Sequence, residues 1–270
     1  MTNSAKIDWE KEIAFLKECA DLYETSGTSP IEDPEYDRRY DAAKVANPDH
    51  SFFKTVGGVS GEHAYGTEIK HEYIMGSLEK SANTDDFQEW FAKTFKDTTG
   101  LEIILEPKVD GSSITNHYKD GKHVLTATRG DGEIGFDVTP NANLVEGIQE
   151  TINSKEDIEI KGESYKNRQD FYANWVGEYK NPRNFAAGAM NHKTASKTKE
   201  RGLNFVAYEV RGIDFATEEE KSKFLKDNGF ENLIDLSIKV NCEGKSVKDI
   251  AEEVQKYMDG LDRENLQFAL

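Results

Sequence analysis

The feature that most restricts the fold is a pair of strand-like segments separated by Asp120-Gly121. Residues 112–119 and 122–129 both contain β-branched or aromatic side chains in the pattern typical of strands. Asp-Gly between two such segments is a strong hairpin signal. Strands joined by a two-residue turn pair antiparallel, so we expect an antiparallel sheet in this part of the chain.

Further helices and strands are expected on both sides of the hairpin. Residues 7–46 predict two helices, the second with Asp33 as its N-cap and Pro34 at its first helical position. The Gly-rich residues 50–66 are expected to form a linker. Beyond it we expect strands over residues 101–108, 158–165, 203–210 and 236–240, and helices over residues 85–95, 218–229 and 246–260. The predicted fold is α+β: a small helical domain over residues 1–65, then a larger domain with antiparallel sheets over residues 66–270.

Composition excludes several classes of protein. No run of 18 apolar residues exists, so a membrane span is excluded, and the N-terminus lacks a hydrophobic signal core, which predicts a cytoplasmic protein. Cys19 and Cys242 stand outside any His/Cys cluster, which argues against a disulfide framework or a zinc site. A net charge of −17 argues against binding nucleic acid over the whole surface. Only residues 178–211 are locally basic, either as a solvated loop or as a phosphate-facing surface.

Lys108 is the first candidate for chemistry. It ends an apolar strand, which we expect to bury its stem, and Asp110-Gly111 then turns the chain away. An ordinary lysine amine, with a pKa near 10.4, is almost fully protonated at neutral pH. A nucleophilic role therefore requires partial burial or cationic neighbours that lower its pKa. The alternative is a surface lysine beside a turn, because a four-residue Lys-x-Asp-Gly motif recurs by chance.

Four further stretches carry groups suited to binding a nucleotide. Arg129 precedes three closely spaced glycines and could bind phosphate or ribose oxygens, or it could be a surface arginine on a Gly-rich hairpin. Glu163 ends a strand as an acceptor for hydroxyls or for a metal-bound phosphate. Residues 181–184, "NPRN", predict a turn that aims Arg183. Tyr208 could lie in the core or stack on a base.

Together these motifs resemble the adenylation module of NAD-dependent DNA ligases, a family in which a Lys-x-Asp-Gly lysine becomes adenylated. That motif is shared with ATP-dependent ligases and RNA-capping enzymes, whereas "ATRGDGEIGFDVTPN" and "NPRNFAAGAM" are much more specific to the NAD branch. The segments "DPEYDRRYD", "VGG" and "HEYIMGSLEK" are similar to the family's small N-terminal domain and to the entry of its nucleotidyltransferase domain. The resemblance covers essentially the whole chain. It implies an ATP-grasp-like ligase adenylation fold for residues 66–270, incomplete at its C-terminus.

The resemblance also implies roles for the candidate residues. Lys108 would attack the α-phosphorus of NAD, release nicotinamide mononucleotide and hold AMP as a phosphoramidate, with Asp110 positioning it or a metal-bound water. Mg²⁺ would neutralise the pyrophosphate, and AMP would then pass to the 5′-phosphate of nicked DNA. The adenylate would contact Glu106 at the adenine edge, Tyr208 by stacking, Arg129 and Glu163 at ribose and phosphate, and also Ser77, Leu78 and Arg183. The nicotinamide mononucleotide half would contact Tyr23, Asp33, Tyr36 and Asp37.

Three features depart from the family's pattern. Glu24 stands where His or Tyr is frequent, and Asn191 where arginine is frequent. The chain also stops before an Asp-Gly-x-Val-x-Lys strand, a second lysine strand and the oligonucleotide-binding and later domains. Either a fragment of a longer ligase or a natural subunit of a split ligase fits this ending, and we favour the split enzyme with a second chain carrying the missing lysines. We expect this chain alone not to seal nicks efficiently.

Two other functions remain open from the sequence. One is a nucleotidyltransferase that uses ATP or GTP, because Lys-x-Asp-Gly does not choose the cofactor. The other is a non-catalytic NAD-binding or regulatory subunit, which would bind NAD without forming covalent AMP. Labelling with NAD or with ATP distinguishes these hypotheses from the adenylation module.

Overall fold

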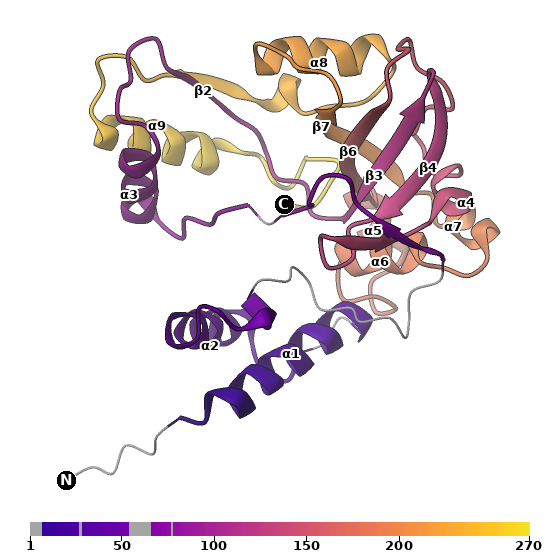
Figure 1. The fold of residues 1–270 in the computed structure, drawn as a ribbon, viewed down its shortest axis with the longest axis horizontal. Coiled ribbons are helices and arrows are strands. Elements are labelled where there is room, and N and C mark those ends of the chain that lie inside the picture. Colours follow the sequence, from indigo (N-terminus) through magenta and orange to yellow (C-terminus); the bar gives the residue numbers. More distant parts are fainter. Residues whose placement is uncertain (1–6, 27–28, 54–65, 77) are drawn as a thin grey trace.

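A four-stranded antiparallel sheet lies at the centre of the computed structural model, which describes residues 7–26, 29–53, 66–76 and 78–270 (Figure 1). Its order is β4-β3-β6-β7, and the strands are β3 (Ser112–Lys119), β4 (Lys122–Thr128), β6 (Ile158–Tyr165) and β7 (Asn204–Arg211). β3 and β4 form the expected hairpin. Asp120 and Gly121 have φ values of 48° and 74°, and positive φ at both central positions is what a type I′ turn requires.

One face of this sheet carries the main hydrophobic core. Ile114, Tyr118 and Ile160 point to this side from β3 and β6 and are at most 1% exposed. Burying each such side chain contributes roughly 1.5–3 kcal/mol to folding. α4 (Thr139–Ala142), α6 (Pro182–Met190) and α8 (Glu218–Asp227) contact the sheet, α5 (Arg168–Asn174) adds Phe171 to the core, and α7 (Ala195–Arg201) packs on α4 and α6. The side chain of Asn181 caps α6 by accepting a hydrogen bond from the Asn184 N–H, and Pro182 occupies the first turn.

The opposite face of the sheet is polar. Because side chains alternate along a strand, the residues between the core residues point to this face, and they include Ser113, Thr115, His117, Glu159, Lys161 and Glu163. Residues 71–76 cover part of this face, and the Thr115 hydroxyl donates to the Met75 sulfur at 3.3 Å. This covering segment follows β1 (Glu68–Lys70), which pairs with β5 (Ile134–Phe136).

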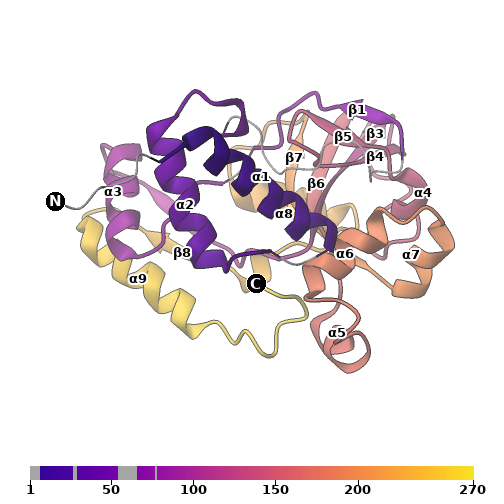
Figure 2. The same cartoon turned by 90° about the horizontal axis from the view of Figure 1, so that it is seen from below.

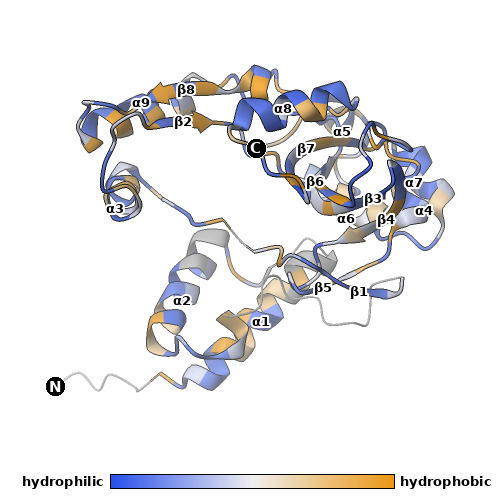
Figure 3. Cartoon of the chain, turned by 45° about the horizontal axis from the view of Figure 1, so that its top comes forward, coloured by the Kyte–Doolittle hydropathy of each residue, from blue (hydrophilic) through white to orange (hydrophobic). Residues whose placement is uncertain are grey.

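A second lobe extends from the sheet. It consists of the antiparallel pair β2 (Glu102–Leu105) and β8 (Ile238–Asn241), covered by α3 (Thr84–Thr94) and α9 (Val247–Gly260). Phe91, Val240 and Ile250 form its buried centre, and β2 is largely apolar in Figure 3. Ser246 and Asp249 form a capping box at the start of α9. The helix α8 (Glu218–Asp227) and a 3₁₀ turn (Ile234–Leu236) connect β7 to this lobe.

The N-terminal residues form a helical pair, seen from below in Figure 2. α1 (Trp9–Ser26) and α2 (Asp33–Ala46) are followed by a 3₁₀ turn (Ser51–Phe53). Arg39 donates to both oxygens of Glu12, at 2.5 and 2.7 Å, so a bidentate ion pair joins the two helices.

The predicted antiparallel α+β fold is confirmed, with several local corrections. Glu32, not Asp33, is the N-cap of α2, and it caps without a side-chain hydrogen bond. β2 ends at Leu105, so Lys108 lies beyond the strand and is exposed rather than buried along its stem. The proposed domain boundary at 65/66 borders residues 54–65, which lie outside the described residues. In the described part of the chain, no helix is long and apolar enough to cross a membrane.

His117 makes the fold sensitive to acid. Burial and nearby positive charge lower the pKa of His117 to about 4, whereas the imidazole titrates near 6.5 in an unfolded chain. The unfolded state therefore binds a proton first, and stability present above pH 6.5 is lost as the pH falls toward 4. Between pH 7.5 and pH 5 this amounts to about 2 kcal/mol. We expect His117→Leu to reduce that loss in urea unfolding measured at both pH values.

A matched variant is His50→Leu, on the N-terminal helical pair. It also removes one histidine but leaves the His117 environment intact. An equal acid sensitivity of wild type and His117→Leu would contradict the assignment.

Candidate active site

Lys108 lies in an extended segment, residues 106–111, that connects β2 to β3. Pro107, Val109 and Gly111 are buried, whereas Lys108 is exposed and Asp110 is half-buried. This alternation is the ordinary two-residue period of an extended chain. The segment therefore presents the amine of Lys108 to solvent while its neighbours fix the backbone.

Gly111 brings this segment into close contact with β6. A Cβ at Gly111 would lie 2.3 Å from the Ser164 carbonyl oxygen, so only glycine fits without displacing backbone. The Gly111 N–H donates to Glu163 Oε1 at 3.2 Å. Glycine at this position thus places the acidic side chain of Glu163 directly beside the Lys108 segment.

Glu163 is a poorly solvated carboxyl group on the polar face of the sheet. Burial raises its pKa to about 7, against the lowering effects of the Lys108 and Arg183 charges and of the Gly111 N–H. The positive charges of Lys108 and Arg183 thus both act on this carboxyl. Since the pKa is close to neutral, Glu163 can hold or release a proton at physiological pH.

Arg183 and Asp110 form an ion pair next to Lys108. Arg183 Nη1 donates to Asp110 Oδ1 at 3.1 Å. Arg183 lies in the first turn of α6. Its side chain is therefore oriented by an N-capped helix, whereas the sequence predicted a turn. The pair keeps a guanidinium within reach of any anionic group that approaches Lys108.

Tyr208 lies on the polar face and not in the main core. β6 and β7 shift register at Lys161/Gly162, and Tyr208 falls at this bulge. Its hydroxyl makes a 2.8 Å hydrogen bond with the Ser113 hydroxyl. Burial and the nearby Glu163 raise the pKa of Tyr208 to about 12, so it stays neutral. Ser113, which pairs across the sheet with Glu163, was missed from the sequence, although the alternation along 112–119 could have revealed it.

Arg129 is tied to the segment that covers the polar face. Its Nε donates to the Met75 carbonyl at 3.0 Å, and the Met75 N–H donates to the Gly132 carbonyl at 2.9 Å. Arg129 begins the Gly-rich turn after β4, so its backbone follows the sheet edge while its side chain reaches residues 71–76. The structure thus places Arg129 in a defined network instead of leaving it as a solvated surface group.

The other residues predicted to contact NAD do not join the group around Lys108 in the described structure. Glu106 is exposed; partial desolvation raises its pKa, Glu218 raises it further and Lys221 opposes both. Leu78 is 75% exposed. Tyr36 packs against Tyr40, with ring centroids 6.0 Å apart, in the core of the helical pair. Ser77 and the side chains of Tyr23, Asp33 and Asp37 lie outside the described residues.

Further along the polar face lies a strip of buried ionisable groups that the sequence did not indicate. His117 Nδ1 lies 3.5 Å from Glu159 Oε1. Burial raises the pKa of Glu159 and lowers that of Lys161. Both carboxylate oxygens of Glu159 are buried without a hydrogen bond in the described structure. This part of the polar face is therefore poorly solvated, which strengthens electrostatic effects among these groups.

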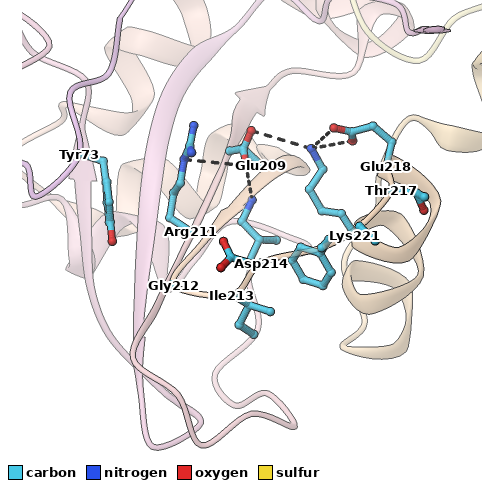
Figure 4. Close-up of a pocket in the computed structure, with 12 residues that line it drawn as sticks. Tyr73, Glu209, Arg211, Gly212, Ile213, Asp214, Thr217, Glu218 and Lys221 are labelled. Atoms are coloured by element: carbon cyan, nitrogen blue, oxygen red, sulfur yellow. Dashed lines mark hydrogen bonds and ion pairs between the residues drawn. The ribbon is translucent and has the colours of Figure 1, made fainter. Parts of the chain in front are cut away.

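A pocket of about 480 Å³ lies at the other end of β7 (Figure 4). Arg211 and Lys221 line it, together with Glu209, which accepts contacts from both at 3.9 and 3.8 Å. Tyr73 stands at its edge. None of the residues predicted to carry the chemistry lines this pocket, so the candidate site is defined by the group around Lys108.

The residues around Lys108 suit attack on a phosphate. The site combines an amine, a carboxyl group that titrates near neutrality, a guanidinium and a half-buried tyrosine ring. No cluster of three or more His, Cys, Asp or Glu side chains suited to a metal exists among the described residues. Mg²⁺ usually binds through one or two carboxylates together with substrate phosphates and water, so these residues fit an ion that arrives with a nucleotide.

Comparison with known proteins places the chain in a family. Residues 64–270 match the model for the NAD-dependent DNA ligase adenylation domain. This chain belongs to that family. The predicted resemblance is confirmed over the larger domain, and the Lys108 segment, Glu163 and Tyr208 all lie inside the matched region.

The relatives are named DNA ligases. One from Wolbachia pipientis of Culex pipiens is 32% identical over 213 residues, covering 77% of this chain and 33% of that protein. One from Nitratiruptor sp. is 29% identical over 276 residues, covering 94% and 41%. One from Bartonella quintana is 31% identical over 287 residues, covering 95% and 38%. The chain thus spans about a third to two fifths of the length of these relatives.

Gly111→Ala tests the close approach of the Lys108 segment to β6. The added methyl group would meet the Ser164 carbonyl at 2.3 Å, and such overpacking typically costs about 1–3 kcal/mol. We expect a loss of that size in urea unfolding. Gly260→Ala is the matched control, because a Cβ there meets nothing within 4 Å; equal stability of the two variants would contradict the contact.

The pKa of Glu163 tests how near Lys108 lies. We expect carboxyl ¹³C NMR of the wild type to show a glutamate that titrates near pH 7 and is absent in Glu163→Gln. Lys108→Ala removes a charge that lowers this pKa, so the midpoint should move above 7. Lys239→Ala, in the second lobe, should leave it in place. If the midpoint of Glu163 does not move in Lys108→Ala, the Lys108 amine does not lie close to the Glu163 carboxyl.

Proposed function

We propose that this chain is the NAD-consuming part of a DNA ligase and that Lys108 is its nucleophile. The observation that carries the proposal is the placement of Lys108, on an extended segment whose Gly111 N–H binds Glu163. Membership in the family of NAD-dependent DNA ligase adenylation domains supports NAD as the substrate. The site needs little rearrangement to receive an anionic phosphate, because the Lys108 amine already projects from the surface.

In the proposed step, the deprotonated Nζ of Lys108 forms a bond to the α-phosphorus of NAD. The phosphoanhydride bond breaks, nicotinamide mononucleotide leaves with its own phosphate, and the proton lost by the amine passes to water. AMP remains on Lys108 as a phosphoramidate. Arg183, held by Asp110 at 3.1 Å, would stabilise negative charge near the attacked phosphate, and Mg²⁺ would neutralise the pyrophosphate.

The nucleotide would be held by the polar face. Tyr208, neutral and fixed by Ser113, offers an aromatic ring for the adenine. Glu163 and Arg129 would bind the ribose and phosphate region, and Glu106, Leu78 and Ser77 would lie along the adenine. We place the nicotinamide half on the N-terminal helical pair, at Tyr23, Asp33, Tyr36 and Asp37, with residues 1–65 as a separate domain.

The AMP would then pass to the 5′-phosphate of nicked DNA. The named relatives are much longer than this chain, and we propose that sealing requires elements beyond it. In the split-enzyme hypothesis a second chain supplies the lysine strands and the oligonucleotide-binding domain. A cytoplasmic location is proposed from the sequence alone.

Incubation with NAD and Mg²⁺, followed by intact-protein mass spectrometry, tests the function. We expect a mass gain of one AMP on the wild type and none on Lys108→Arg, which keeps a positive charge beside Glu163 but removes the nucleophile. Lys193→Arg controls for the substitution itself and should label normally. Label from ATP but not NAD would favour the ATP-using alternative. NAD binding without label would favour a non-catalytic subunit.

A further inference from the structure

The segment that follows α9 returns from the second lobe to the central sheet (Figure 1). Arg168, at the start of α5, donates from its backbone N–H to the Gln267 carbonyl at 2.7 Å and from Nη1 to the Glu264 carbonyl at 2.7 Å. Two residues beyond Gln267, the Ala269 carbonyl accepts a hydrogen bond from the Asp110 N–H at 2.9 Å. Residues 264–269, here named the return segment, are thus fixed at one end to α5 and at the other to the Lys108 segment.

Phe268 anchors the return segment. It is 3% exposed and belongs to a small buried cluster with Val109, Tyr165, Val206 and Leu233, separate from the main core. Its ring meets that of Tyr165 edge to face, with centroids 5.7 Å apart and planes at 84°. The Tyr165 hydroxyl in turn donates to Glu231 at 3.2 Å. The Tyr165 ring, against which Phe268 packs, is therefore itself held in place by a hydrogen bond.

The same cluster lies directly beneath the nucleophile. Val109 follows Lys108 in the chain and points inward, 4% exposed, into the cluster that holds Phe268. Residues 106–111 fall between the end of β2 and the start of β3. Two backbone N–H groups hold them: that of Gly111, bound to Glu163, and that of Asp110, bound to Ala269. One of these two attachments belongs to the return segment.

We infer that Phe268 is a positioning residue for Lys108. It acts through Val109 and through the Asp110–Ala269 hydrogen bond, and it touches no group that would bind NAD. The inference rests on the proposed role of Lys108 as the nucleophile. Because a displacement of about 1 Å at a reacting group can cost on the order of 100-fold in rate, loss of this support should slow AMP transfer while NAD binding stays nearly unchanged.

Phe268→Ala tests the inference in single-turnover formation of lysyl-AMP at a series of NAD concentrations. We expect the maximal rate to fall about tenfold or more, and the NAD concentration for half-maximal rate to change less than about twofold. Phe268→Leu, which refills most of the cavity, should restore most of the rate. The matched control is Phe230→Ala, another phenylalanine 3% exposed, but packed in the main core. An unchanged rate in Phe268→Ala, or an equal fall in Phe230→Ala, would overturn the inference.

Amide exchange at Asp110 provides a readout that does not depend on activity. If Phe268 holds the return segment in place, Phe268→Ala should speed exchange of the Asp110 N–H at least about tenfold, and Phe230→Ala should leave it near the wild-type value once both are corrected for global stability. Unchanged exchange in Phe268→Ala would overturn the inference. If the wild type does not take AMP from NAD, the proposed function is wrong. The exchange experiment would still show whether Phe268 supports the segment that carries Lys108.

Discussion

The hydrogen bond from the Gly111 N–H to Glu163 is the contact on which the arrangement around Lys108 depends. It joins an extended segment to the central sheet at a separation that leaves no room for a side chain on residue 111. Burial raises the pKa of this carboxyl group to about 7, although Lys108 and the Gly111 N–H both lower it. A carboxyl in water would stay ionised at that pH. Close packing of backbone therefore sets the electrostatic character of the site.

The local charges agree with the proposal that this strongly acidic chain binds an anionic nucleotide. The net charge of −17 is spread over the whole sequence, but the positive charges of Lys108 and Arg183 meet at one end of the polar face. There Asp110 orients Arg183 through an ion pair of 3.1 Å. The proposed recognition of phosphate would thus depend on a few oriented groups and would require no basic surface over the rest of the molecule.

The sequence predicted the parts of the fold that depend on local periodicity. The 112–129 hairpin, the strands and the longer helices follow from alternation and from turn chemistry at Asp120-Gly121. Lys108, Glu163, Arg183 and Tyr208 could likewise be selected from the sequence by residue type and by the motifs around them, although their roles remain proposals. Burial of the Lys108 stem was predicted wrongly, because Pro107 and Val109 take the inward positions in the extended segment. Phe268 gave no signal: its importance comes from a contact between chain segments far apart in sequence, which no periodic pattern encodes.

Two chain connections between the second lobe and the central sheet meet at Lys108, the proposed nucleophile. Residues 106–111 leave β2 for β3, and the return segment leaves α9 for the same place, where the Asp110 N–H binds the Ala269 carbonyl. The buried cluster of Val109 and Phe268 lies at this crossing. The position of Lys108 is consequently fixed by both parts of the molecule at once. The sheet supplies Glu163 and Tyr208, and the lobe supplies the segments that carry and support the lysine. In the proposed reaction, alignment of the amine would therefore depend on both parts of the molecule.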